Sequence, residues 1–415
     1  MKRIKRLAVS IIFLSLGLLC AIPAAAGQNE KDNKAILLVT FGTSVQSAMP
    51  AYNNLEQAVQ AAFPGVEVRW AYTSKIIRDK LAARDGRLID DPFTALSKLK
   101  AEGYDRIVVQ SDHIFAGQEY NDLMDVLDNF LAPDAGKFGP RKISLGRPLL
   151  YQHEDYVNTA KALAAQFPAD TGTNAVILMG HGSKHPADSA YGKLNDILRH
   201  MYKNVFLGTV EGYPTLEEVK EDLAASGTKK VTLMPLMNIA GDHTVNDLYG
   251  DEEDSWKSQL NKSGYETEGY LKGLLENRAI VNIFVAHLAA AMAELEEEAV
   301  KDAEVRVNGE KIKFSEPPRA GDGFIMAQLR PIFEAMGCTV SWAEDKGTVI
   351  AEKTGLALSF RQDSAYVSVN GAEVVMENDC RLVNGSLMLP LSFLNEHLGY
   401  SVNWDLNGNI KINKK

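Results

Sequence analysis

From Lys34 onward, short apolar runs alternate with segments whose apolar residues recur every three or four positions. A short apolar run predicts a β-strand, and the longer period predicts a helix, as around Leu55, Val59 and Phe63. Strands are expected at residues 35–41, 67–72, 106–110, 175–179, 205–209 and 229–237. This alternation is typical of an α/β domain in which mostly parallel sheets are flanked by helices.

Two stretches of this region resemble two later ones. ILLVTFGTS at residues 36–44 is similar to VILMGHGSK at 176–184, and VVQSDHIFAGQEYNDL at 108–123 is similar to TLMPLMNIAGDHTVNDL at 232–248. The region therefore consists of two related halves, and we expect each half to form one lobe with its own sheet.

The two lobes are expected at about residues 34–150 and 172–300, within a bilobal domain at residues 27–300. Facing α/β lobes leave a cleft between them, which is a usual position for a ligand. When the halves are aligned, Glu119 lies opposite His243, so Glu119 is a candidate for the wall of this cleft.

Residues 303–415 have a different pattern and repeat internally with a period of 62 residues. The matched positions are Val307-Asn308-Gly309 with Val369-Asn370-Gly371, Gly323 with Gly385, Gly337 with Gly399, and Trp342 with Trp404. Two copies predict a small α+β tandem module rather than a solenoid. The module resembles the N-terminal domain of copper amine oxidases, and we expect it to attach the protein to the cell envelope. Spacing is the alternative role, and catalysis is not expected, because the single histidine of the module, His397, cannot form a copper site alone.

Residues 1–26 have the order of a secretory signal: a basic start, the uncharged run Leu7 to Leu19, and a small-residue site that favours cleavage after Ala26. The thirteen residues of the run cover about 20 Å as a helix. This is less than the ~30 Å hydrocarbon core of a bilayer, so no stable transmembrane anchor is expected. We therefore expect an extracytoplasmic protein that is periplasmic, associated with the cell envelope or secreted.

The formal net charge of the chain is −10. Without residues 1–26, 40 basic side chains face 54 acidic ones, which argues against a nucleic-acid-binding protein. No GxGxxG or Walker loop is present, so no nucleotide cofactor is expected. Outside the signal-like segment the cysteines are Cys338 and Cys380, which either pair in an oxidising compartment or stay separate buried thiols. The oligomeric state is open, including a homo-oligomer.

Two histidines and a glutamate follow three expected strands. His181 lies in Gly-His-Gly-Ser after the strand at 175–179, Glu211 follows 205–209, and His243 follows 229–237. Parallel strands end at one edge of a sheet, where open α/β sheets bind ligands. Imidazole nitrogens and a carboxylate suit a divalent transition metal such as cobalt, nickel, iron or zinc, although each residue alone also fits a structural role.

The other histidines are weaker candidates for a functional site. His185 follows His181 by four residues, but no glutamate between them supports a zinc-protease motif, so His185 is assigned only to the cleft mouth. His113 ends the equivalent strand of the first half, and either faces the cleft or supports it from behind. His287 falls on an apolar helical stripe and is expected in the core. His153 and His200 are not accompanied by other candidate site residues.

Together these motifs resemble the class II tetrapyrrole chelatases, specifically the anaerobic sirohydrochlorin cobaltochelatases. The resemblance covers about residues 35–295 and rests on ILLVTFGTS, QSDHIFAGQEY, GHGSKHPADSAY, VEGYP and IAGDHTVNDL in that order. It implies a macrocycle in the cleft and a metal-binding and catalytic role for His181, Glu211 and His243. Asp112 stands where many relatives have leucine.

This resemblance implies that divalent cobalt, with iron or nickel as alternatives, is inserted into a tetrapyrrole. One imidazole would accept a pyrrole proton. The substrate is polycarboxylated, so Lys184, Lys75 and Arg78 are candidates to bind its carboxylates. The alternative is a non-catalytic, extracytoplasmic carrier of metal or tetrapyrrole, which the signal and the C-terminal module favour.

Overall fold

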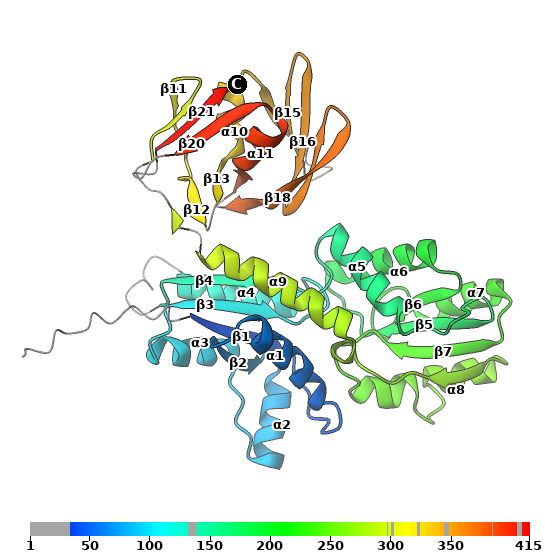
Figure 1. Ribbon diagram of the computed structural model, residues 1–415. Helices are drawn as coiled ribbons and strands as arrows, with labels where there is room; N and C mark the ends of the chain where they lie inside the picture. Colours follow the sequence, from blue (N-terminus) through cyan, green and yellow to red (C-terminus); the bar gives the residue numbers. More distant parts are fainter. Residues whose placement is uncertain are drawn as a thin grey trace, which may run out of the picture. The chain divides into compact units, whose positions relative to one another are not determined.

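The computed structural model describes residues 34–131, 139–296, 298–299, 303–321, 324–343, 348–383, 385–404 and 409–415. The expected signal at residues 1–26 lies outside the described residues. Figure 1 shows two parallel sheets with flanking helices and a strand-rich C-terminal region. The expected α/β class with two similar lobes and a small C-terminal domain is confirmed.

The first lobe is built on four parallel strands in the order β2-β1-β3-β4. The strands are β1 (Lys34–Thr40), β2 (Glu67–Tyr72), β3 (Arg106–Ser111) and β4 (Lys142–Gly146). The helices are α1 (Pro50–Ala62), α2 (Lys75–Asp85), α3 (Pro92–Ala101) and α4 (Gln118–Leu131). Successive residues of β1 enter two different cores: Leu38 packs with Leu55 of α1, and Leu37 packs with Leu96 of α3. The central strand is apolar throughout because helices cover both of its faces.

The second lobe repeats this topology with the order β6-β5-β7-β8. Its strands are β5 (Asn174–Gly180), β6 (Val205–Thr209), β7 (Lys230–Pro235) and β8 (Glu266–Gly269). Its helices are α6 (Ser189–Met201), α7 (Leu216–Ser226) and α8 (Trp256–Lys262). A capping box of Thr215 and Glu218 begins α7, and Gly227 ends it with a left-handed φ of 73°.

Two helices connect the lobes. Helix α9 (Arg278–Glu296) lies in the second half of the sequence, yet it packs on β3 and β4 of the first sheet and on α5 (His153–Ala164). By length and composition, α9 is the one helix among the described residues that is apolar enough to cross a membrane, but Phe284 and Leu288 on it are fully buried in the core. His287 is buried there as expected, and its Nε2 lies 2.9 Å from Asp155 Oδ1.

The C-terminal region has its own hydrophobic core, whose members all fall within residues 305–412. Its elements are β9 (Glu298–Ala299), β10 (Val305–Val307), β11 (Glu310–Ile312), β12 (Arg319–Gly321), β13 (Phe324–Gln328), α10 (Leu329–Ala335), β14 (Thr339–Ala343), β15 (Thr348–Lys353), β16 (Leu356–Arg361), β17 (Ser364–Val369), β18 (Ala372–Val383), β19 (Ser386–Pro390), α11 (Ser392–His397), β20 (Tyr400–Trp404) and β21 (Ile410–Lys414). They form one four-stranded and one nine-stranded sheet. Cys338 and Cys380 are both buried and both free.

The 62-residue repeat is visible in the backbone of this region. Asn308 and Asn370 have φ values of 48° and 52°, and the glycine after each has a φ near 87°. Two consecutive left-handed residues form the tight hairpin turn that Asn-Gly favours. The repeated tryptophans, Trp342 and Trp404, lie on β14 and β20, and both are exposed.

Candidate functional site

The two histidines and the glutamate follow neighbouring strands of the second sheet. His181 comes directly after β5, Glu211 follows β6, and His243 follows β7 and precedes a π-helical turn, η3 (Thr244–Leu248). Since β5 pairs in parallel with both β6 and β7, these exits lie at the carboxyl edge of one sheet.

The structure brings the two imidazoles together. The ring centroids of His181 and His243 lie 4.6 Å apart, with the ring planes almost perpendicular at 88°. His181 is exposed, and the side chain of His243 is 38% exposed. Two neutral imidazoles that are close together and open to solvent are suited to bind one transition-metal ion.

Hydrogen bonds orient both rings through the same nitrogen. Nδ1 of His181 lies 2.9 Å from the Gly182 carbonyl, and Nδ1 of His243 lies 2.6 Å from Asp247 Oδ2. Because a carbonyl oxygen only accepts hydrogen bonds, Nδ1 of His181 carries the proton, and its lone pair is on Nε2. The Asp247 carboxylate assigns the same tautomer to His243. Both Nε2 atoms are thereby free to bind a metal. A histidine that donates from Nδ1 and binds through Nε2 is common in metal sites.

The loop that carries Glu211 lies beside the loop that carries His181. The Glu211 backbone N–H donates to the His181 carbonyl at 2.8 Å. Glu211 is exposed. Within the described part of the chain, no group of three or more His, Cys, Asp or Glu side chains is arranged to hold a metal ion. The role of Glu211 as the third ligand therefore stays a prediction.

Asp188 connects these two loops. Its Oδ1 accepts the Ser183 N–H at 2.8 Å, and its Oδ2 accepts the Tyr213 N–H at 2.9 Å. The close approach also requires glycine. Gly182 has a φ of +83°, and a Cβ there would lie 2.3 Å from the backbone nitrogen of Gly212. One carboxylate and two glycines thus set the distance between the loops after β5 and β6.

Asp112 and His113 end β3 of the first lobe, and both are affected by burial. Burial raises the pKa of Asp112 to about 8, although a hydrogen bond with Thr40 acts in the opposite direction. Burial lowers the pKa of His113 to about 4. The Ser111 hydroxyl lies 2.8 Å from His113 Nδ1, and the buried Nε2 has no partner among the described residues. His113 is therefore a neutral imidazole, and its cleft role stays a prediction.

The remaining cleft candidates have different environments. His185 Nε2 lies 3.2 Å from Asn121 Nδ2 of α4, so His185 contacts the first lobe from the second. Glu119 is half-buried in the first turn of α4, and Lys184 is exposed beside the His181 loop. These positions agree with a cleft wall, but their contact with a substrate stays a prediction.

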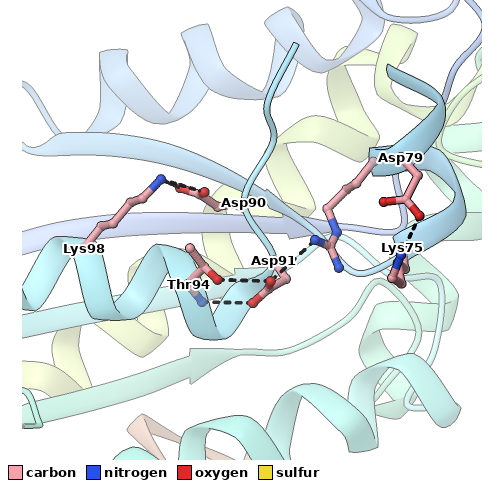
Figure 2. Close-up of polar contacts among 7 residues, drawn as sticks. Lys75, Asp79, Asp90, Asp91, Thr94 and Lys98 are labelled. Atoms are coloured by element: carbon pink, nitrogen blue, oxygen red, sulfur yellow. Dashed lines mark hydrogen bonds and ion pairs between the residues drawn. The ribbon is translucent and has the colours of Figure 1, made fainter. Parts of the chain in front are cut away.

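Lys75 and Arg78, proposed above for substrate carboxylates, both have acidic partners on the first lobe. Lys75 Nζ lies 2.5 Å from Asp79 Oδ2, and Arg78 Nη1 lies 3.4 Å from Asp91 Oδ2. Figure 2 shows Lys75 turned toward Asp79. These partners already satisfy the two cations, which makes them weaker candidates than the sequence indicated.

Two family models match the chain. The model described as cobalt chelatase (CbiK) matches residues 34–293, which include both lobes and all of the candidate site residues. The chain belongs to the cobalt chelatase family. A second model, described as the copper amine oxidase N-terminal domain, matches residues 306–412. The two resemblances found in the sequence are therefore confirmed.

Curated relatives of this chelatase include the sirohydrochlorin cobaltochelatase of Salmonella typhimurium, which is 39% identical over 64% of this chain and 99% of its own length. The sirohydrochlorin cobaltochelatase CbiKC of Nitratidesulfovibrio vulgaris is 37% identical over 64% of this chain and 92% of its own. Among solved structures, SirB from Bacillus subtilis with Fe3+ is 17% identical, with a TM-score of 0.44 over 63% of this chain and 96% of that one.

Two residues of this chelatase site, Asp247 and Asp188, were not predicted from the sequence. Asp247 is four residues after His243, which is a helical spacing that places the two side chains on one face. This signal was present in the sequence. Asp188 was harder to find, because its role depends on two backbone N–H groups from different loops, and no side-chain motif records such contacts.

Proposed function

We propose that this chelatase inserts divalent cobalt into sirohydrochlorin and releases two protons. The observation that carries the proposal is the pair of imidazoles, His181 and His243, whose Nε2 atoms are open while their Nδ1 atoms are held. The two curated relatives are named sirohydrochlorin cobaltochelatases, which supports the same metal and macrocycle.

The imidazole pair supplies an incomplete coordination sphere. Two nitrogens hold the metal ion through Nε2, and Glu211 on the adjacent loop offsets its charge. A closed cage of four protein ligands would retain the ion, whereas an open set lets it transfer to the macrocycle. Weak binding by this site is therefore part of its function.

Insertion also requires a base, because a free tetrapyrrole carries two pyrrole N–H protons. Imidazole has a pKa near neutrality, so one histidine of the pair accepts a pyrrole proton as the metal leaves it. In His243 the positive charge that forms is stabilised by the Asp247 carboxylate, 2.6 Å from its Nδ1. We assign His243 as the proton acceptor on this basis.

The test is a spectroscopic insertion assay with purified protein, sirohydrochlorin and cobalt(II). The wild type should convert the macrocycle faster than the uncatalysed mixture, and His181→Ala and His243→Ala should each lower the rate by about 100-fold or more. His153→Ala, which changes a histidine at the start of α5, is the matched control and should keep the wild-type rate. Full activity of either site variant would remove the assignment.

The same assay addresses the metal and the competing carrier function. Iron(II) and nickel(II) fit the same ligand types, and comparing kcat/KM for the three metals identifies the preferred one. A carrier would instead bind metal or tetrapyrrole stoichiometrically without accelerating conversion.

We further propose that the chelatase acts outside the cytoplasm. The proposal rests on the signal-like order of residues 1–26. Expression of the full chain followed by cell fractionation tests it: an exported, shortened protein beginning near Gly27 is expected, and an uncleaved cytoplasmic protein would contradict it.

A further inference from the structure

An open pocket of about 530 Å³ lies between the two lobes. On the first lobe it is lined by residues 44–46, which follow β1, and by α2; on the second lobe it is lined by Asp242, the residue before His243. The two walls are close, because a Cβ added to Gly241 would lie 3.9 Å from Thr43 Oγ1. The pocket therefore belongs to the same cleft as the candidate metal site.

Three residues of α2 line this pocket: Ile77, Lys80 and Arg84. Their spacing of three and then four residues places them on one face of the helix. Lys75, whose ammonium pairs with Asp79 (Figure 2), is not among the lining residues. One face of α2 thus points into the cleft, while Lys75 contributes to a surface ion pair.

The two cations in the pocket differ in their availability. Arg84 Nη1 donates to the Ser44 carbonyl at 2.7 Å, and its Nε and Nη2 donate to the Asp85 carboxylate. Arg84 is therefore committed to holding the loop after β1. Lys80 is exposed and has no ion pair or hydrogen bond with any residue that the structure describes.

The wall of the pocket on the second lobe carries a negative charge. Asp242 is exposed, and its Oδ1 accepts a hydrogen bond from Asn246 at 3.1 Å. In a chain with a strong acidic excess, a lysine that has no partner among the described residues attracts an anion into this pocket, whereas Asp242 on the opposite wall repels it.

We propose that this pocket binds a carboxylate-bearing side chain of the tetrapyrrole substrate, with Lys80 as its cationic partner. This inference rests on the proposed function and adds a specificity-determining residue to it. The macrocycle reaches the imidazole pair while one of its acidic side chains extends along the pocket to α2. Lys80 thereby favours polycarboxylated macrocycles over those whose acidic groups are esterified.

The test compares Lys80→Gln with Lys161→Gln, which removes the same charge from an exposed position on α5 outside the pocket. Lys80→Gln should raise KM for sirohydrochlorin about 5- to 20-fold, with little change in kcat. Lys161→Gln should match the wild type, and Lys80→Arg should restore most of the affinity. Asp242→Asn should lower KM.

A binding measurement separates this inference from the proposed function. Fluorescence titration of metal-free sirohydrochlorin gives a Kd without turnover, and Lys80→Gln should weaken this Kd by the same factor. A wild type that binds the macrocycle but does not insert cobalt would contradict the proposed function alone. Equal Kd values for wild type, Lys80→Gln and Lys161→Gln, or no binding by the wild type, would overturn the pocket assignment.

Discussion

His243 and Asp247 form the contact that most directly sets the chemistry of the site. The carboxylate fixes which imidazole nitrogen carries a proton and holds the ring in one orientation. The corresponding partner of His181 is a neutral backbone carbonyl, so the two imidazoles are not equivalent. In the proposed mechanism, this asymmetry would distinguish a ring that mainly holds the metal from one that also accepts a proton.

We expect Asp247→Asn to weaken cobalt(II) binding about 10- to 100-fold, because the amide orients the ring less strongly and does not stabilise its positive charge. Isothermal titration with cobalt(II) measures this change. Asp242→Asn is the control, since it removes a carboxylate next to His243 that bonds Asn246 rather than the imidazole. If both variants bind cobalt alike, the contact does not tune the metal site.

Asp112 makes stability depend on pH. Its pKa in the folded chain is about 8 because it is buried, whereas an unfolded aspartate titrates near 3.8. Between these two pH values the folded chain keeps the proton on Asp112, whereas the unfolded chain has lost it. The contribution of Asp112 to the free energy of unfolding is therefore greatest below about pH 4 and decreases up to about pH 8.

Asp112→Asn should therefore stabilise the fold by about 1–3 kcal/mol at pH 8 and by much less at pH 4.5. Thermal unfolding at several pH values measures the difference, and Asp196→Asn, an exposed aspartate on α6, is the control. A gain that does not grow with pH would show that Asp112 is ionised in the folded protein.

At the scale of elements, the sequence predicted the central strands well, because buried parallel strands are continuous apolar runs. The edge strands β4 and β8 were missed, since KISLG and ETEG are short and partly polar. The apolar stripe of α9 showed that one face is buried, but a stripe does not say which sheet it meets. Its packing on the first lobe came only from the structure.

The same limit applies to the site. Parallel topology predicted that His181 and His243 follow neighbouring strands and meet, and the 4.6 Å between their rings confirms this. The orientation of Glu211 depends on loop conformation, which residue spacing does not determine. Lys80 was missed because only the helix face that it shares with Ile77 and Arg84 places it in the cleft.

The loops after β5 and β6 make a prediction that belongs to this scale. Gly182→Ala should lower both stability and cobalt insertion, because the methyl group meets the Gly212 backbone and φ is left-handed at Gly182. We expect a loss of about 1–3 kcal/mol in the free energy of unfolding and at least a 10-fold loss in insertion rate.

Gly192→Ala is the matched control for that variant. Gly192 lies within α6, where an added Cβ meets nothing within 4 Å, so alanine should stabilise the helix by about 0.5–1 kcal/mol without changing insertion. Chemical denaturation and the insertion assay measure both effects. Equal behaviour of the two variants would show that the approach of the two loops does not matter to the site.

At the scale of the molecule, the two family regions have separate cores. The buried apolar residues of the C-terminal region contact one another within residues 305–412, and no chelatase residue belongs to that cluster. The Salmonella typhimurium relative aligns over 99% of its length with 64% of this chain, so it matches the chelatase region alone. On this basis we expect the catalytic domain to fold without the tandem module.

Deletion of residues 303–415 should therefore leave kcat/KM for cobalt insertion within about twofold of the full chain. The same deletion should abolish attachment if the module contacts the cell envelope, because the exposed Trp342 and Trp404 are lost with it. Insertion assays on the purified truncated chain, together with fractionation of cells that express it, measure the two outcomes separately. A large loss of insertion would make the module part of the catalytic unit, whereas unchanged envelope association would place the attachment elsewhere in the chain.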